Sequence, residues 1–281
     1  MGKADLHAHT TASDGLFTPS QLVQHAQSLG IQAVAITDHD TVSGIAEGLE
    51  AGKKLGIQVI PGVELSTLWN GKEIHMLGYY IQFDNENFRT LLMKQRNTRK
   101  LRNEMMIRKL NELGISISLE EVNQKKKSSS KELNVGRPHI AEVLIEKGIV
   151  GSMNEAFDKY LGKDGLAYIT PERISPFEAI DLVKQNGGVT VLAHPGLYQQ
   201  DDLIPQLVQH GLIGIEVNHP DHTAEDRKRY QEIATKYQLI TTAGSDFHGE
   251  RQGSMYHAEL GTCTVDISQV AALQKKSGSN K

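Results

Sequence analysis

The sequence has almost no cysteine and no long apolar run, and both absences narrow what the chain can be. Cys263 is the only cysteine among 281 residues, so no intrachain disulfide can form, which suits a reducing compartment. No apolar stretch approaches the ~18 residues that a membrane-spanning helix needs. The N-terminal MGKADLHAHT lacks the basic and then apolar regions of a signal peptide. We therefore expect a cytoplasmic protein with no membrane partner.

The sequence also lacks a strong excess of either charge. Its 30 Lys and Arg residues nearly balance 34 Asp and Glu residues, giving a formal net charge of −4. Proteins that bind long nucleic acids usually carry a basic field, so we expect no long duplex partner. Small anionic substrates remain compatible, because one site can be positive on a chain that is not. We see no internal repeat and no sign of an obligate protein partner.

Strand and helix patterns alternate along most of the chain. The expected strands are residues 3–9, 31–38, 57–67, 73–81, 188–194, 213–218, 239–246 and 258–265, and the expected helices 19–29, 43–55, 176–185, 201–210 and 224–237. Repeated strand–helix units favour a parallel sheet in an α/β fold. Their number and the chain length favour a TIM-like barrel over a doubly wound sheet.

Residues 86–165 break this alternation. A long helix over 86–113 leads to the polar stretch QKKKSSSK (124–131) and then to helices over 138–147 and 153–160. The polar stretch predicts a solvated loop, with a loop that helps to hold an anionic substrate as the alternative. We expect a discontinuous barrel formed by residues 1–98 and 166–275, an inserted helical specificity subdomain over 99–165, and a disordered tail over 276–281.

Histidines and carboxylates gather where the expected strands end, which is where (β/α) barrels place their active sites. The candidate metal ligands are His7, His9, Asp14, His39, Glu64, His75, His194, Asp246 and His248. Imidazole and carboxylate groups together suit Zn²⁺, Mn²⁺ or Fe²⁺. One ion takes about four to six ligands, so this larger set predicts two or three divalent ions that share a bridging carboxylate.

The other histidines carry less information. His25, His210 and His257 lie on expected helices or away from strand ends, so we expect them to have ordinary structural roles. His219 and His222, in the segment NHPDH, follow an expected strand. They either support the ligands or contact the substrate, or have no role in the site. We keep His219 as a candidate substrate contact.

Several segments together resemble the PHP (polymerase and histidinol phosphatase) family. They are DLHAHTTASDG, AITDHDT, IPGVELS, EIHMLGYYI, AHPG and AGSDFHG, which follow the family's order over nearly the whole chain. NVGRPHIAEVL resembles the branch of 3′,5′-nucleotide bisphosphate phosphatases and short-RNA 5′→3′ exoribonucleases. The resemblance implies a distorted (β/α)₇ barrel, the PHP fold, with a trinuclear metal centre.

The resemblance also implies how the ligands divide. The three implied subsites are His7, His9, Glu64 and Asp246; Glu64 with His75 and His194; and Asp14 with His39 and His248. Asp14 stands where some relatives have histidine, which supports the narrower branch. Asp38 is expected to orient a ligand histidine. Mn²⁺ is the first expectation for the metal, with Fe²⁺ or Zn²⁺ as alternatives.

The implied activity is hydrolysis of a 3′,5′-nucleotide bisphosphate to the 5′-nucleotide and phosphate, and of short 5′-phosphorylated RNA, by a metal-bridging hydroxide. We expect Asp246 or a cluster histidine such as His194 to take part in proton transfer. Three alternatives stay open: a histidinol phosphatase, an amidohydrolase that cleaves C–N bonds, and a non-catalytic metal- or nucleotide-binding protein.

Basic residues of the insertion are the expected substrate contacts. Arg137 and His139, in GRPHIA, precede an expected helix start, where a guanidinium fork and helix amides both favour phosphate. A structural ion pair is the alternative for Arg137. Arg96 and Arg99 share a helix face that leads into the insertion. They either reach the phosphate or form a solvated face.

Overall fold

The computed structural model describes most of the chain. Residues 1, 126–135, 170–171, 252–253, 256 and 279–281 lie outside the described part, as do the side chains at 99, 251, 254 and 255. Most of the expected polar loop at 124–131 and the end of the expected tail therefore lie outside it.

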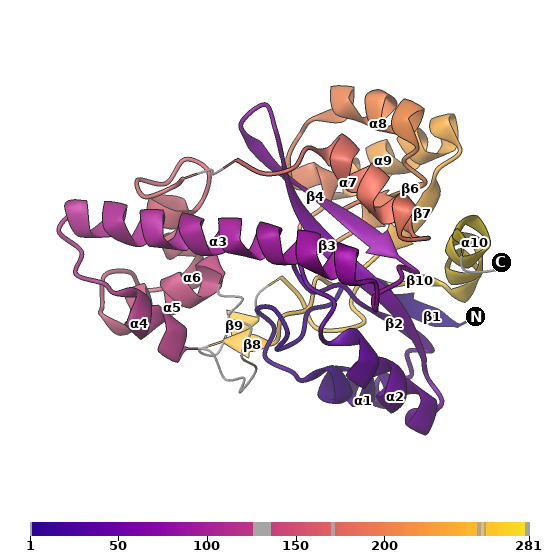
Figure 1. Cartoon of the computed structure of the whole chain (residues 1–281), viewed down its shortest axis with the longest axis horizontal. Helices are drawn as coiled ribbons and strands as arrows, with labels where there is room; N and C mark the ends of the chain where they lie inside the picture. The colour runs from indigo at the N-terminus through magenta and orange to yellow at the C-terminus, as the bar shows by residue number, and fades with distance from the viewer. Residues whose placement is uncertain (1, 126–135, 170–171, 252–253, 256, 279–281) are drawn as a thin grey trace.

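An eight-stranded mixed sheet curls into a nearly closed barrel (Figure 1). Its strands, in spatial order, are β10 (Val265–Asp266), β1 (Lys3–Asp5), β2 (Ala33–Ile36), β3 (Gln58–Trp69), β4 (Lys72–Tyr79), β5 (Val189–Leu192), β6 (Gly214–Asn218) and β7 (Ile240–Ala243). The segments that follow β1 and β7 bring the two sides together. Leu6 N–H donates to the Ala243 carbonyl at 3.0 Å, and Ala8 forms a parallel bridge with Phe247. The expected α/β, barrel-like fold is confirmed.

The expectation of a parallel sheet is wrong at β4. This strand runs antiparallel to both β3 and β5, and β10 runs antiparallel to β1. β3 and β4 form a hairpin whose turn residues Asn70 and Gly71 have φ of 48° and 74°, the left-handed values that favour an Asn-Gly pair in a two-residue turn. Because β4 runs back along β3, its early residue His75 lies at the carboxyl end of the neighbouring strands.

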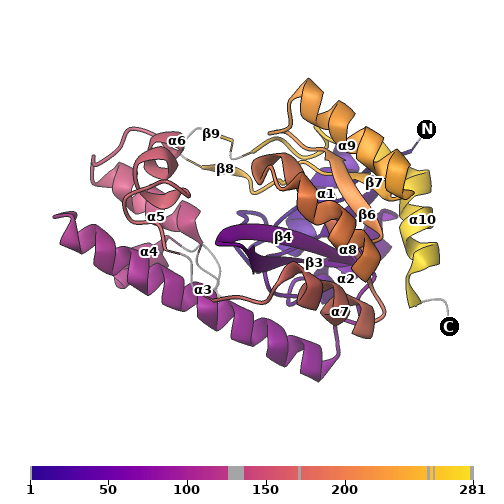
Figure 2. The ribbon, with the colours of Figure 1, turned by 90° about the horizontal axis from the view of Figure 1, so that it is seen from above.

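Helices cover the outside of the barrel (Figures 1 and 2). They are α1 (Pro19–Ser28), α2 (Ile45–Leu55), α7 (Pro176–Gln185), α8 (Ile204–His210), α9 (Ala224–Tyr237) and α10 (Ile267–Lys276). Capping boxes start α1 at Thr18 and α7 at Ser175, and each satisfies backbone donors that the helix leaves unpaired. Apolar residues of these helices pack with the strands, those of α10 in a separate cluster from the other helices.

The expectation of a disordered tail from residue 276 is wrong for its first residues. α10 extends to Lys276, and the Ser277 N–H donates to the Leu273 carbonyl at 3.1 Å. The Gly278 N–H then donates to the Gly187 carbonyl at 2.8 Å. Polar composition suggested disorder, but these backbone hydrogen bonds attach the segment to the barrel.

A second apolar cluster lies within the helices between β4 and α7. These helices are α3 (Glu86–Glu112), α4 (Leu119–Gln124), α5 (Arg137–Glu146), α6 (Met153–Ala156) and the π-helical turn η1 (Phe157–Leu161). α3 belongs to both cores, because Phe88 and Leu92 pack in the barrel while Met106 and Leu110 pack in the second cluster. Figures 1 and 2 show this helix crossing from the barrel to the helical part, where the hairpin β8 (Glu250–Arg251) and β9 (Ser254–Met255) lies beside α6.

The close approach of two backbone segments requires glycine at position 244, near the start of the site. A Cβ at Gly244 would lie 2.1 Å from His7 Cβ and 2.5 Å from His7 N. Such contacts are far inside van der Waals separation, so only glycine lets the chain after β7 pass this close to the chain after β1. Glycine there positions the segments that carry His7 and Asp246.

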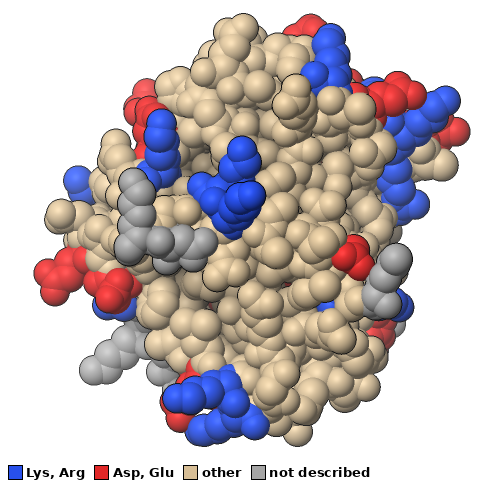
Figure 3. Space-filling model, turned by 90° about the vertical axis from the view of Figure 1, so that its right-hand side faces the viewer, with Lys and Arg blue, Asp and Glu red and all other residues tan. Residues whose placement is uncertain are grey.

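Charged side chains of both signs are distributed over the surface. On the face in Figure 3, basic and acidic side chains lie in small scattered groups and not in one continuous basic field. None of the helices described combines the length and the apolar character needed to cross a bilayer.

The single cysteine provides a test of packing. Cys263 is 3% exposed, and burial raises the pKa of its thiol to about 11. At pH 8 a thiol of that pKa is only about one part in a thousand thiolate, the reactive form. We expect the native protein to react with a disulfide reagent far more slowly at pH 8 than the denatured chain, which should titrate as one thiol. Equal rates would contradict the buried position.

Candidate metal centre

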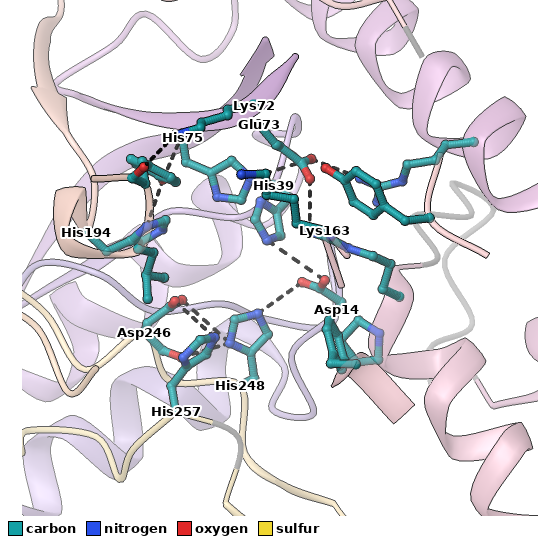
Figure 4. Close-up of a pocket in the computed structure, with 17 residues that line it drawn as sticks. Asp14, His39, Lys72, Glu73, His75, Lys163, His194, Asp246, His248 and His257 are labelled. Atoms are coloured by element: carbon teal, nitrogen blue, oxygen red, sulfur yellow. Dashed lines mark hydrogen bonds and ion pairs between the residues drawn. The ribbon is translucent and has the colours of Figure 1, made fainter. Parts of the chain in front are cut away.

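All nine expected ligands lie together at one end of the barrel, and Figure 4 shows several of them around the cavity. His7 and His9 follow β1, and His39 follows β2 at a bridge to Glu64 of β3. His194 follows β5 with a φ of 25°, and Asp246 follows β7 with a φ of 50°. Non-glycine residues rarely take such backbone angles, and they occur often at functional sites.

Glu64 lies at the centre of the cluster, and its two oxygens face different histidines. Its Oε1 lies 2.7 Å from His75 Nδ1 and 3.1 Å from His194 Nε2. Its Oε2 lies 3.4 Å from His7 Nε2, 3.2 Å from His9 Nε2 and 2.9 Å from His39 Nδ1. A carboxylate with each oxygen in a different set of imidazoles has the arrangement needed to bridge two cations.

Asp246 and Asp14 complete two groups around Glu64. Asp246 Oδ1 lies 3.4 Å from His7 Nε2 and 3.0 Å from His9 Nε2. Asp14 Oδ1 lies 3.4 Å from His248 Nε2, and Figure 4 shows Asp14 between His248 and His39. The ligand atoms within each set lie inside 4.8 Å of one another, the sets being His7, His9, Glu64 and Asp246, and His9, Asp14, His39 and His248.

The hydrogen bonding of the buried ligand atoms shows whether these residues fit metal ions. His7 Nε2, His9 Nε2, Glu64 Oε2 and Asp246 Oδ1 are buried, and within the described part of the chain they find no partner with hydrogen-bond geometry. Buried polar atoms without partners are costly and uncommon. Here they are Lewis bases directed at one another, which is the donor set that divalent cations need. These buried clusters fit more than one metal site.

Groups behind the ligands fix their ring orientations. His7 Nδ1 lies 3.1 Å from Glu216 Oε1, and Glu216 Oε2 accepts the backbone N–H of His194 at 2.8 Å. His194 Nδ1 lies 2.7 Å from the Tyr198 hydroxyl. Such partners hold a ligand imidazole in one tautomer. Sequence analysis missed Glu216, although a carboxylate inside the apolar run IGIEVN was a usable signal.

Asp38 does not do what the sequence suggested. Its Oδ1 accepts the Thr10 N–H at 2.7 Å and the Ser13 hydroxyl, and its Oδ2 accepts the Thr10 hydroxyl at 2.7 Å. These hydrogen bonds go to Thr10 and Ser13 and not to a histidine, so the expectation that Asp38 orients a ligand histidine is wrong. It stabilises the loop that presents Asp14 to the cluster.

Mutual attraction keeps the carboxylates charged despite burial. Burial alone would raise the pKa of Glu64, but the imidazoles of His39, His75 and His7 hold it well below its usual range. Burial opposes charge on His9 as well, and Asp246 and Glu64 raise its pKa to about 10. Divalent cations would take the place of these imidazole protons as counter-charge.

His257 is wrongly expected to be ordinary. Its Nδ1 lies 2.7 Å from Asp221 Oδ2, and its Nε2 lies 3.3 Å from Asp246 Oδ2. It lines the cavity beside Asp246 and His248 (Figure 4). The residue precedes the expected strand 258–265 and does not follow the carboxyl end of any expected strand, so the pattern that found the other histidines could not find it.

The remaining histidines differ in role. His219 is fully buried, with Nε2 3.4 Å from Asp246 Oδ2. The cavity lining does not include it, so it supports the carboxylate rather than the cavity wall. His222 Nδ1 donates to the Val217 carbonyl at 2.8 Å, and its Nε2 accepts the Gly196 N–H at 3.1 Å. His210 pairs with Asp181 at the surface at 3.1 Å.

A cavity of about 230 Å³ opens beside the cluster. Its other wall is basic and aromatic and comes mostly from the helical part. The residues that line this wall are Lys72, Arg102, Arg137, Pro138, Phe157, Lys163 and Tyr168. The candidate metal ligands therefore form one wall of the cavity, and the opposite wall has side chains suited to bind an anion and an aromatic ring.

The expected substrate contacts only partly reach this cavity. Arg137 lines it, with its guanidinium 5.8 Å from the Phe157 ring centroid, and also pairs with Glu73 at 2.9 Å. His139 Nδ1 accepts the Gly136 N–H at 3.1 Å at the start of α5, and the cavity lining does not include it. Arg96 Nη1 donates to the Asp40 carbonyl at 3.0 Å, also apart from the lining.

Two further arginines, Arg99 and Arg173, remain to be placed. The side chain of Arg99 lies outside the described part of the chain. Sequence analysis missed Arg173, whose buried guanidinium lies 3.5 Å from Asp40 Oδ2 and 3.7 Å from Glu73 Oε1.

Comparison with known proteins agrees with this geometry. The family model described as the PHP domain matches residues 5–185. A solved structure from Bifidobacterium adolescentis, described as a metal-dependent phosphoesterase, superposes with a TM-score of 0.88 at 32% identity and covers 97% of this chain and 95% of that one.

Three curated relatives cover most of the chain. The 5′-3′ exoribonuclease Rnm of Escherichia coli is 34% identical over 87% of this chain and 84% of its own length. The phosphoribosyl 1,2-cyclic phosphate 1,2-diphosphodiesterase of Eggerthella lenta is 32% identical over 88% and 94%. The 3′,5′-nucleoside bisphosphate phosphatase of Chromobacterium violaceum is 30% identical over 90% of each. The chain therefore belongs to the PHP family of metal-dependent phosphoesterases.

Proposed function

We propose that this phosphoesterase acts on small nucleotides, converting a 3′,5′-nucleotide bisphosphate to the 5′-nucleotide and phosphate. We propose short 5′-phosphorylated RNA as a further substrate. The observation that carries this proposal is the basic and aromatic wall that shares one cavity with the ligand cluster. Relatives that act on such substrates support it.

The wall matches the parts of a bisphosphate that are not cleaved. Arg137 and Lys163 offer positive charge, and a guanidinium forms paired hydrogen bonds with phosphate oxygens. Phe157 and Tyr168 offer ring faces on which a base stacks, a contact that tolerates every base. Arg137, Phe157 and Lys163 belong to the helical insertion, and Tyr168 follows it. We propose this insertion, over residues 99–165, as the specificity subdomain of a barrel formed by 1–98 and 166–275.

The cluster would perform the hydrolysis. We propose that the nine candidate ligands hold two or three divalent ions, with Mn²⁺ first and Fe²⁺ or Zn²⁺ as alternatives. Such ions activate water at neutral pH and neutralise phosphoryl charge. Glu64 and Asp246 keep their charge in the buried site. We propose that His194, whose Nδ1 lies 2.7 Å from the Tyr198 hydroxyl in the cavity lining, takes part in proton transfer to the leaving oxygen.

The alternatives fit the cavity less well. Histidinol phosphate has one phosphate and a cationic remainder, which Arg137 and Lys163 would repel. An amidohydrolase needs the cluster but has no use for a second anion site. A non-catalytic nucleotide-binding protein would show metal and nucleotide binding without release of phosphate.

Comparative turnover tests the assignment directly. With Mn²⁺ present, we expect adenosine 3′,5′-bisphosphate to have a kcat/KM at least about tenfold above that of histidinol phosphate, a difference of about 1.4 kcal/mol. A 5′-phosphorylated RNA oligomer should release mononucleotides. Phosphoribosyl 1,2-cyclic phosphate, the substrate named for one relative, serves as a competing arm. A preference for that diester or for histidinol phosphate, or no phosphate release, would overturn the proposal.

Metal removal tests the cluster itself. Dialysis against a chelator should abolish hydrolysis and lower the melting temperature, because ions that bind only the folded chain stabilise it. Restoring Mn²⁺ should recover both. The metal-free protein should still show the native far-UV spectrum, which separates loss of ions from unfolding. Undiminished activity in metal-free protein would contradict the proposal.

Arg137 tests the second phosphate site. We expect R137A to raise KM for adenosine 3′,5′-bisphosphate by about 10- to 100-fold, since a charge-assisted hydrogen bond contributes about 1.5–3 kcal/mol, with a smaller change in kcat. Hydrolysis of p-nitrophenyl phosphate, which has no second phosphate, should change little. R108A removes an exposed arginine of α3 outside the cavity lining and serves as the matched control. Equal losses on both substrates would assign Arg137 a structural role.

A further inference from the structure

We propose that His219, Asp221 and His257 form a clamp that positions Asp246, holding one carboxylate oxygen so that the other faces the metal ligands. We call these three residues the Asp246 clamp. The proposal rests on the proposed metal cluster, and it assigns its residues a positioning role without direct contact to substrate.

The two oxygens of Asp246 have separate surroundings. Oδ1 faces His7 Nε2 and His9 Nε2, at 3.4 and 3.0 Å, and has no partner with hydrogen-bond geometry in the part of the chain described. Oδ2 faces His219 Nε2 at 3.4 Å and His257 Nε2 at 3.3 Å. One oxygen is therefore available to a cation, and two imidazole rings lie against the other.

The tautomer of His219 follows from its other ring nitrogen. The Asp221 backbone N–H points at His219 Nδ1 over 3.2 Å, so Nδ1 accepts a hydrogen bond and carries no proton. A neutral imidazole has one N–H, which must then lie on Nε2 and is directed at Asp246 Oδ2. Arg227 Nη2 donates to the His219 carbonyl at 3.1 Å and fixes the backbone that carries this donor.

His257 is held against the same oxygen by a carboxylate. Asp221 Oδ2 lies 2.7 Å from its Nδ1 and accepts a hydrogen bond from it, so the single N–H of the neutral ring is used on Asp221. Asp221 therefore positions both imidazoles, one through its backbone N–H and one through its side chain, and His219 is the one that donates to Asp246. The backbone at both Asp246 and His257 is left-handed, with φ of 50° and 61°. Such conformations persist where surrounding contacts over-determine them, as these contacts do.

The same evidence argues against a separate metal ion among these residues. His219, Asp246 and His257 place one potential ligand atom each within 4.8 Å of the others. A metal ligand needs a lone pair, and the Nε2 of neutral His219 carries a proton instead. The trio therefore matches an oriented carboxylate better than a further cation site.

Metal affinity tests the clamp without relying on turnover. H219F keeps a ring but removes the donor, and we expect the site that includes Asp246 to bind Mn²⁺ about 10- to 100-fold more weakly, as for other groups that orient ligands. H219Q returns an N–H donor at a similar reach and should recover most of the affinity. D221A leaves the backbone donor to His219 and should cause a smaller loss. Chelator competition and metal content per chain measure all three.

A matched control comes from the neighbouring histidine. Both ring nitrogens of His222 are used by the Val217 carbonyl and the Gly196 N–H, away from Asp246. H222Q should keep wild-type metal affinity even if it lowers the melting temperature. Wild-type affinity in H219F, or equal losses in H219F and H222Q, would overturn the clamp. A wild-type chain that binds no divalent ion would instead overturn the proposed function.

Discussion

The site depends on the concentration of ionised carboxylates at a buried end of the barrel. Glu64 and Asp246 are almost fully buried and keep their charge because imidazoles surround them. Burial of charge is costly unless every group has a partner of opposite charge or a metal. The histidines at the neighbouring strand ends are thus as much a condition for folding this end of the barrel as a feature of its chemistry. Divalent ions would satisfy the same requirement with fewer protons.

The sheet topology determines which side chains meet this requirement. Parallel strands bring their carboxyl ends to one rim, and this accounts for His7, His39, His194 and Asp246. A uniformly parallel barrel would place the early part of β4 at the opposite end. The antiparallel hairpin of β3 and β4 reverses that, and the register pairs His75 with Ser66, two residues beyond Glu64. The tight Asn70–Gly71 turn therefore has a direct consequence for the cluster.

Much of this could be predicted from sequence, and the failures have physical causes. Ligands at strand ends repeat with the strand pattern, so the amino-acid sequence alone predicts their positions. The Asn-Gly pair was a usable signal for the reversal of β4, and the expectation of a parallel sheet, drawn from the repeated strand–helix pattern, did not use it. Asp38 and His257 were misjudged because a side chain's partner depends on loop geometry. Glu216 contacts His7, which is distant in sequence, and Tyr198 contacts His194 four residues before it. Neither periodicity nor resemblance indicated those contacts.

The ligand cluster and the basic wall meet at one carboxylate. Glu73 Oε1 lies 3.6 Å from His75 Nε2 and 2.9 Å from Arg102 Nη1, while its Oε2 lies 2.9 Å from Arg137 Nη2. Burial would raise the pKa of Glu73, but these guanidinium groups hold it well below its usual range.

Arg173 also contacts Glu73, at 3.7 Å, and contacts Asp40 at 3.5 Å. In this network three guanidinium groups therefore share two carboxylates, and Lys72 and Lys163 lie in the same cavity. The ion pair with Glu73 orients the guanidinium of Arg137, which also lines the cavity. A structural pairing and attraction for an anion are thus compatible in the same side chain, because the carboxylate that holds Arg137 is shared with two other cations.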